Sequence, residues 1–158
     1  MLRAIRAVAP AEREGRALID TVILDYAQRS TQGITVTGTK GGQYVIALRG
    51  PARLRGDDVL ELEDGRCIEV VAKAEPLVEA RHTDVATLAR LAWQLGDRHV
   101  PMQVLRNRIR ARRDPLVEAV FAASDAKVMP IEAPFEPEGG AYSLADDHKH
   151  AHDHGHRH

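Results

Sequence analysis

The 158-residue chain has little cysteine, few aromatic residues, almost no excess charge and no long apolar run. Its one cysteine, Cys67, excludes an intrachain disulfide and a thiolate cluster, and it suits a reducing compartment. The net charge of −1 provides no overall field to attract nucleic acid or an acidic membrane. No segment approaches the ~20 apolar residues that span a bilayer, and Arg3 and Arg6 interrupt any N-terminal signal core. We therefore expect a cytoplasmic protein without a membrane partner.

The common catalytic motifs are also missing. The sequence contains no His-Glu-x-x-His, no Gly-x-Ser-x-Gly, no Gly-x-x-x-x-Gly-Lys-Ser/Thr and no dinucleotide-binding glycine fingerprint. What is present, 44% hydrophobic and 28% charged residues, is typical of a folded globular chain. We therefore expect a protein that is not an enzyme.

Residues 1–75 are predicted to form a small β-rich domain. Gly41-Gly42 and Asp64-Gly65 provide turns between short β-type runs, because glycine accepts the positive φ of tight hairpins. The runs are Leu18–Tyr26, Ile34–Lys40, Gln43–Arg49, Val59–Leu62 and Cys67–Ala72. This order favours an antiparallel sheet, with the boundary to a second domain at Ala74-Glu75-Pro76.

Residues 76–142 change to an alternating pattern of strands and helices. The first helix is expected from Asp84 to Leu95, with Thr83 or Asp84 as its cap, Gly96 as its stop and an inner face of Val85, Leu88, Ala89, Ala92 and Leu95. Asp114-Pro115 opens a second helix, whose inner face is Leu116, Val117, Val120 and Phe121. The strands are Leu77–Ala80, Val100–Leu105, Arg108–Arg112 and Lys127–Ala133. The order βαββαβ predicts a ferredoxin-like domain, and the chain as a whole an α+β protein.

Residues 143–158 are predicted to be a disordered tail. The segment after Tyr142 is nearly free of apolar residues, so no buried area offsets the ~1–2 kcal/mol of backbone entropy that ordering each residue costs. Histidine recurs there at every second position, and six of the eight histidines of the chain lie in its last eleven residues. They are His148, His150, His152, His154, His156 and His158.

Alternating histidines indicate metal binding. Neutral imidazole binds Ni(II), Cu(II), Zn(II) and Co(II), and residues i and i+2 of an extended segment point the same way about 7 Å apart. Because no scaffold fixes the ligands, we expect several exchangeable ions, which protons displace near the free histidine pKa of about 6.5. An expression tag is the alternative origin of such a tail, but the interspersed Asp, Lys, Ala, Gly and Arg residues differ from a designed run.

The remaining histidines and the cysteine each have a structural interpretation. His99, after the Gly96 helix stop, could bond a backbone carbonyl, or it could pair with its copy across a two-fold dimer to hold a metal ion. His82, beside Thr83, is read as a strand-end or capping residue. Cys67 is read as a small buried residue of a strand.

A cluster of arginines on one predicted hairpin raises the possibility of an RNA-recognition domain. RNA-recognition sheets stack bases on aromatic residues of their inner strands, and neither Val100–Leu105 nor Arg108–Arg112 contains one. We therefore expect no nucleic-acid partner and favour a solvated or subunit-facing strand. The arginines are Arg106, Arg108, Arg110, Arg112 and Arg113.

Two segments carry a family resemblance. The segments Gly96-Asp97-Arg98-His99-Val100-Pro101 and Ala133-Pro134-Phe135-Glu136-Pro137-Glu138-Gly139-Gly140-Ala141-Tyr142, followed by the histidine tail, resemble the family of the urease accessory nickel metallochaperone UreE. Further matches are Asp25-Tyr26 with Arg29, Arg49-Gly50, Leu54-Arg55-Gly56-Asp57 and Asp64-Gly65.

The resemblance implies a function and a set of partners. It implies a peptide-binding-like first domain, a ferredoxin-like metal-binding second domain and a homodimer in which both copies of His99 meet one Ni(II) ion. It further implies delivery of nickel to apo-urease with the other accessory proteins, including the GTPase. Arg113 and Pro115 stand near where some members carry extra histidines, and Asp97 stands where asparagine is usual. A storage or buffering protein for nickel or zinc, without a client, is the alternative.

Overall fold

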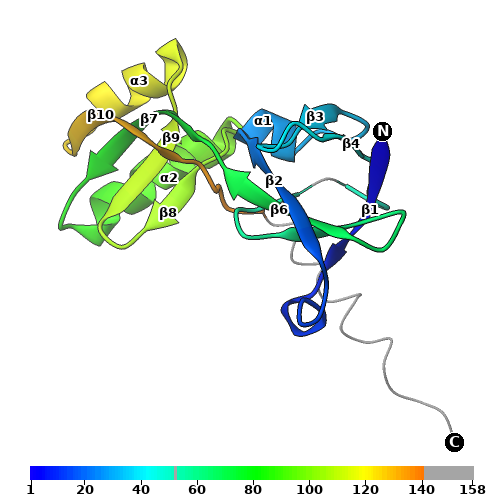
Figure 1. Cartoon of the computed structure of the whole chain (residues 1–158). Helices are drawn as coiled ribbons and strands as arrows, with labels where there is room; N and C mark the ends of the chain where they lie inside the picture. Colours follow the sequence, from blue (N-terminus) through cyan, green and yellow to red (C-terminus); the bar gives the residue numbers. More distant parts are fainter. Residues whose placement is uncertain (52, 141–158) are drawn as a thin grey trace, which may run out of the picture.

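The computed structural model describes residues 1–51 and 53–140, apart from the side chain of Pro10. They form two sheets that lie side by side, with α2 and α3 packed on the smaller one (Figure 1). The larger sheet has six strands in the order β2-β6-β5-β1-β4-β3. Its strands are β1 (Leu2–Val8), β2 (Leu18–Leu24), β3 (Thr35–Thr37), β4 (Gln43–Ile46), β5 (Val59–Leu62) and β6 (Cys67–Ala72). A 3₁₀ turn, η1 (Pro10–Glu12), follows β1, and a one-turn helix, α1 (Tyr26–Arg29), follows β2.

The expectation of a purely antiparallel first sheet is wrong. β1 pairs in parallel with β4, and β2 pairs in parallel with β6, so the sheet is mixed. The first pair involves β1, a central strand that the sequence pattern does not reveal because Arg3 and Arg6 interrupt its apolar residues. The second involves β2, which lies at the edge of the sheet. The predicted strands at Val59–Leu62 and Cys67–Ala72 are confirmed with the same bounds.

The first predicted strand, Leu18–Tyr26, is too long by two residues. β2 ends at Leu24, and Asp25 then caps α1. The Asp25 carboxylate accepts a hydrogen bond from the Gln28 N–H, while the Gln28 side chain accepts one from the Asp25 N–H. This reciprocal capping box starts a helix within a β-rich region.

The smaller sheet confirms the predicted βαββαβ order. Its four strands follow the order β10-β7-β9-β8, and every neighbouring pair is antiparallel, as in a ferredoxin-like fold. The elements are β7 (Ala74–Arg81), α2 (Val85–Asp97), β8 (Gln103–Leu105), β9 (Arg108–Arg112), α3 (Pro115–Ala122) and β10 (Lys127–Pro134). One face of this sheet packs against the helices, with Val78, Ile109, Leu95 and Phe121 in a common core.

Strand bounds in this half differ from the expected ones for identifiable reasons. Ala74-Glu75-Pro76 is the beginning of β7 rather than a loop, because β10 pairs with β7 along its whole length. β8 begins at Gln103 rather than Val100, because Val100 completes the turn after α2 and Pro101 has no N–H to donate.

The predicted inner faces of the two helices are only partly confirmed. Val117 and Phe121 are buried as expected, but Val85 and Leu116 are 76% and 45% exposed. Val85 is the first residue of α2 and Leu116 lies in the first turn of α3, so both lie at the edge of the packed helix surface.

A buried arginine ties the two sheets together. Arg29, 2% exposed, donates to the carbonyl oxygens of Leu24, Leu54 and Phe135. The Tyr26 ring meets the Phe135 ring edge to face at 5.3 Å between centroids, and the Arg112 guanidinium lies 4.8 Å from the Tyr26 centroid. These contacts join α1 to the segment that follows β10.

The predicted tail, 143–158, lies outside the described residues. In the part of the chain that is described, no helix is long and apolar enough to cross a membrane.

Candidate metal centre

His99 lies in the turn that ends α2. Its N–H donates to the Gly96 oxygen at 3.0 Å, and the Val100 N–H donates to the Leu95 oxygen at 3.0 Å. This pair of bonds is a Schellman motif, with His99 in the position that glycine usually takes. Gly96, predicted as the helix stop, lies inside α2 instead, and the chain turns three residues later.

The backbone of His99 is left-handed, with φ of 56°. A residue with a Cβ pays about 1–2 kcal/mol for this conformation, although histidine tolerates it better than most. Glycine would form the same turn at lower cost. The chain therefore retains an imidazole where the backbone favours glycine, which points to a role for the side chain.

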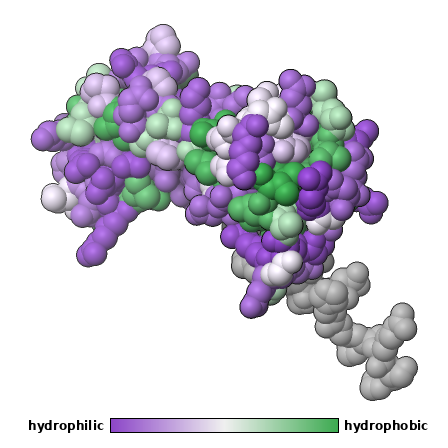
Figure 2. Space-filling model, viewed as in Figure 1, coloured by the Kyte–Doolittle hydropathy of each residue, from purple (hydrophilic) through white to green (hydrophobic). Residues whose placement is uncertain are grey.

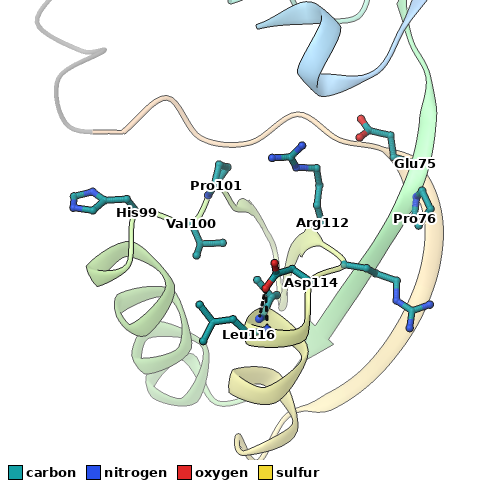
Figure 3. Close-up of a pocket in the computed structure, with 10 residues that line it drawn as sticks. Glu75, Pro76, His99, Val100, Pro101, Arg112, Asp114 and Leu116 are labelled. Atoms are coloured by element: carbon teal, nitrogen blue, oxygen red, sulfur yellow. Dashed lines mark hydrogen bonds between the residues drawn. The ribbon is translucent and has the colours of Figure 1, made fainter.

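A groove of about 520 Å³ lies beside His99. His99, Val100 and Pro101 line one end, and Glu75 and Pro76 line the other (Figure 3). The His99 ring lies at the rim and points away from the other lining residues (Figure 3). His99 is exposed, so the imidazole is open to a ligand from outside the chain.

The carboxylate in the middle of this groove has a structural task. Asp114 is the cap of α3 and accepts hydrogen bonds from the N–H groups of Leu116 and Val117 (Figure 3). Among residues 1–51 and 53–140, no three His, Cys, Asp or Glu side chains come together as a metal site. Within this part of one chain, the exposed His99 therefore does not belong to a set of three such side chains.

His82 and Cys67 have the structural roles that the sequence predicts. The Nδ1 atom of His82 accepts a hydrogen bond from the Asp84 N–H at 2.9 Å, immediately before α2. Asp84 is the N-cap of that helix, and its carboxylate accepts from Ala86 and Thr87. The pKa of Asp84 is lowered, first by the backbone bond from Ala86. Cys67 is 1% exposed and unpaired in β6.

An apolar surface that the sequence analysis missed lies next to His99. Trp93, 69% exposed, lines a shallow hollow between α2 and α3 together with Leu116 and Val120. The signal was available: Trp93, the only tryptophan, falls outside the inner stripe of its helix. Exposed apolar clusters of this kind mark contact surfaces.

Glu138, in the segment that follows β10, is hydrogen-bonded just beyond the same turn. The Glu138 N–H donates to the Met102 oxygen at 2.8 Å, and the Glu138 carboxylate accepts from the Val104 N–H at 3.2 Å. The segment after β10 thereby crosses to the edge of β8. The last described residue, Gly140, is two positions further on.

The fold and these features define a two-sheet α+β protein with a ferredoxin-like second half. Residues 2–73 match the family model for the UreE urease accessory protein N-terminal domain, and residues 75–158 match that for the C-terminal domain. The chain therefore belongs to the UreE urease accessory protein family, and the resemblance seen in its motifs is confirmed. The family name denotes an accessory protein rather than a catalyst.

Relatives of this name align over nearly the whole chain. The protein from Bradyrhizobium sp. strain BTAi1 is 47% identical over 97% of this chain and 73% of its own length. Those from Beijerinckia indica and Chelativorans sp. strain BNC1 are 41% and 40% identical, over 96% and 98% of this chain and 87% and 97% of their own lengths. All three are named urease accessory protein UreE.

Proposed function

We propose that this protein is a cytoplasmic nickel metallochaperone that captures Ni(II) and delivers it to apo-urease together with the other urease accessory proteins, including the GTPase. The observation that carries the proposal is His99, an outward imidazole kept at a left-handed position where glycine would cost less. Membership of the UreE family supplies the urease context.

A homodimer supplies the second ligand in this proposal. One imidazole binds nickel weakly, whereas a two-fold axis beside His99 brings two imidazoles to one ion. The apolar hollow of Trp93, Leu116 and Val120 lies between α3 and the C-terminal part of α2, the part that leads to His99. It supports a contact between two subunits there. Burying tryptophan at the centre of an interface is a strong source of binding energy.

The tail gathers ions and passes them to His99. From Gly140 to His148 the chain has eight residues, which span at most about 29 Å and on average about 16 Å if flexible. Glu138 is hydrogen-bonded to Met102, which is three residues after His99 in the sequence. This length supports transfer between the proposed tail ligands, His148 to His158 at every second position, and the His99 pair.

The metal is assigned to nickel through the family, because imidazole ligands alone do not exclude Zn(II), Cu(II) or Co(II). Competition dialysis of nickel against zinc with the full chain measures the preference directly. We expect nickel bound to the His99 pair to survive an equal concentration of zinc. Displacement by zinc at both the tail and His99 would favour a general metal buffer.

Equilibrium dialysis with Ni(II) tests the division of roles. Truncation after Tyr142 is expected to remove most of the bound nickel and leave about one ion per dimer. His99→Ala in the truncated chain then removes that ion. His82→Ala is the matched control, because its Nδ1 already accepts the Asp84 N–H and its loss leaves nickel binding unchanged. Equal nickel binding with and without His99 would contradict the proposal.

The dimer and the client need separate measurements. Trp93→Glu is expected to give a monomer by light scattering and to lose the His99-bound ion while the tail still binds nickel. Activation of apo-urease by the nickel-loaded protein with its accessory proteins distinguishes delivery from storage. A storage protein would bind the same ions and give no activation beyond that of free nickel.

A further inference from the structure

The open face of the four-stranded sheet carries a cluster of arginines around a buried carboxylate. Glu79, in the middle of β7, is 0% exposed. Arg110 Nε lies 2.7 Å from the Glu79 Oε2 atom, Arg81 Nε contacts Oε1, and Arg108 Nη1 lies 3.7 Å from Oε2. One negative charge thus meets three positive ones.

The register of the strands places these residues on one face. Glu79 is the partner of Arg110, and Arg81 is the partner of Arg108. Their neighbours Val78 and Ala80 point into the core beneath α2 and α3, so Glu79 and its arginines lie on the opposite face. The next strand adds Lys127 and Met129 beside Arg81 and Glu79. The surface over this part of the molecule is largely hydrophilic, while apolar areas gather over the six-stranded sheet (Figure 2).

Glu79 holds the arginine side chains in position without neutralising their total positive charge. Burial raises the pKa of Glu79, but the hydrogen bonds and charges of Arg110 and Arg81 lower it further, so the carboxylate stays ionised. Arg81 and Arg110 each use Nε for this contact, and among residues 1–51 and 53–140 no hydrogen bond engages their Nη groups. The side chains of Arg81 and Arg108 remain 47% and 33% exposed. Glu79 therefore holds Arg81 and Arg110 by hydrogen bonds and Arg108 by a longer ion pair, and it leaves guanidinium N–H donors available to a partner.

We propose that this face, defined by Arg81, Arg108, Arg110, Lys127 and Met129, is a docking surface for an acidic segment of another protein. Guanidinium groups bind carboxylates through two parallel hydrogen bonds, and fixing them beforehand lowers the entropy cost of binding. The surface works independently of nickel and of His99.

The composition of the face favours a protein over a nucleic acid. Beside the arginines of β9, this face carries Leu105 on the neighbouring strand β8 and Met129 and Ile131 on β10, beyond β7. Arginine and methionine are enriched at protein interfaces. None of these strand residues is an aromatic on which bases could stack, and the Tyr26 ring beside Arg112 is already in contact with Arg112 and Phe135. The chain's own tail is a poorer occupant, because Lys149 and Arg157 offset its three aspartates.

Fluorescence anisotropy with a labelled peptide, Glu-Leu-Glu-Glu-Leu-Glu, tests the surface on the full chain at physiological salt. The double variant Arg81→Gln/Arg108→Gln is expected to bind the peptide at least tenfold more weakly, since the loss of even one charge-assisted hydrogen bond is worth about that factor. It leaves Arg110 to hold Glu79. Arg81→Lys/Arg108→Lys keeps the charge but loses the paired geometry, and an intermediate affinity is expected.

Arg90→Gln is the matched control, because it removes an exposed arginine from α2, on the helical side of the sheet. It is expected to bind the peptide as the unmodified chain does. Equal affinities for the double glutamine variant and Arg90→Gln would overturn the proposal. So would polyuridylate binding as tightly as the peptide, or a tenfold gain in peptide affinity on truncation after Tyr142, which would make the tail the occupant. Unchanged nickel stoichiometry in the double variant separates this result from the metal site.

Discussion

Each sheet buries one carboxylate, but the partners differ in kind. Asp20, 3% exposed in β2, accepts hydrogen bonds from neutral groups: the N–H groups of Thr21 and Lys40 at 2.8 and 3.0 Å, and the hydroxyls of Tyr44 and Thr39 at 3.0 and 3.3 Å. Glu79 in β7 instead meets three arginines. Neutral donors bring no charge to the surface, whereas arginines do.

The difference separates a structural cluster from a candidate contact surface. Asp20 anchors the loop 38–42, and that loop leaves no room beside it: a Cβ on Gly38 would lie 2.1 Å from the Asp20 Oδ2 atom. This cluster is closed to other molecules. The Glu79 cluster is closed only at its centre, and its guanidinium groups extend into solvent. A buried carboxylate can therefore either hold a loop or position charges for a partner.

Low pH is expected to reduce the free energy of unfolding more than any single substitution, because it protonates both Asp20 and Glu79. Burial raises the pKa of Asp20, but the bonds from Lys40, Thr21 and Tyr44 lower it below its ordinary value, and the pKa of Glu79 is lowered as well. Both groups thus contribute stability that is complete above their unfolded pKa and is lost as pH falls through the folded pKa. Urea unfolding measured between pH 7 and pH 3 should show this loss. In Glu79→Gln the free energy of unfolding should fall less steeply as the pH is lowered. A slope unchanged by that substitution would contradict the assignment.

Asp20→Ala is expected to be the most destabilising of the single substitutions. It leaves the buried Tyr44 hydroxyl and the Lys40 N–H without an acceptor, at a cost of about 3 kcal/mol in the free energy of unfolding. Asp20→Asn, which retains one acceptor oxygen, should lose less than half of that. Urea denaturation at pH 7 measures both, and equal losses would mean that packing rather than hydrogen bonding matters there.

Glu79→Gln is expected to cost less, about 2 kcal/mol, because the arginines that lose their counter-charge can turn into solvent. Added salt should then recover part of the loss by screening the repulsion between the arginines. The same salt should not rescue Asp20→Ala, whose partners are neutral. A salt response shared by both variants would remove the distinction between the two sheets.

The sequence predicted most of the second sheet and less of the first. Periodicity and caps identified α2, α3 and the βαββαβ order, because these are local signals. The strand β1 was missed, since its parallel partner β4 lies about 40 residues away and only tertiary packing explains Arg3 and Arg6 in a central strand. The capping residues of α1 were visible in Asp25 and Gln28, but β propensity outweighed them.

The sequence identified His99 as a candidate ligand but did not predict the local geometry of its turn. His99 was found from its position after a helix and from the family motif, whereas the Schellman turn depends on where α2 ends, and Gly96 suggested an earlier end. The arginines of β9 were recognised as a basic group. Their anchor, Glu79, belongs to a strand about 30 residues earlier in the sequence, so only the register of β7 and β9 brings them together.

His99→Gly is expected to have the smallest effect, and in the opposite direction. Glycine adopts the φ of 56° without a Cβ clash, so the free energy of unfolding should rise by about 0.5–1 kcal/mol in the presence of a chelator. His99→Ala is the matched control, because it removes the same imidazole but keeps the Cβ, and its stability should stay near that of the unmodified chain. A glycine variant no more stable than the alanine variant would mean that this turn carries no strain. A gain limited to glycine would show that the side chain at position 99 lowers the stability of the fold. The Asp20 side chain does the opposite, because its hydrogen bonds stabilise the fold.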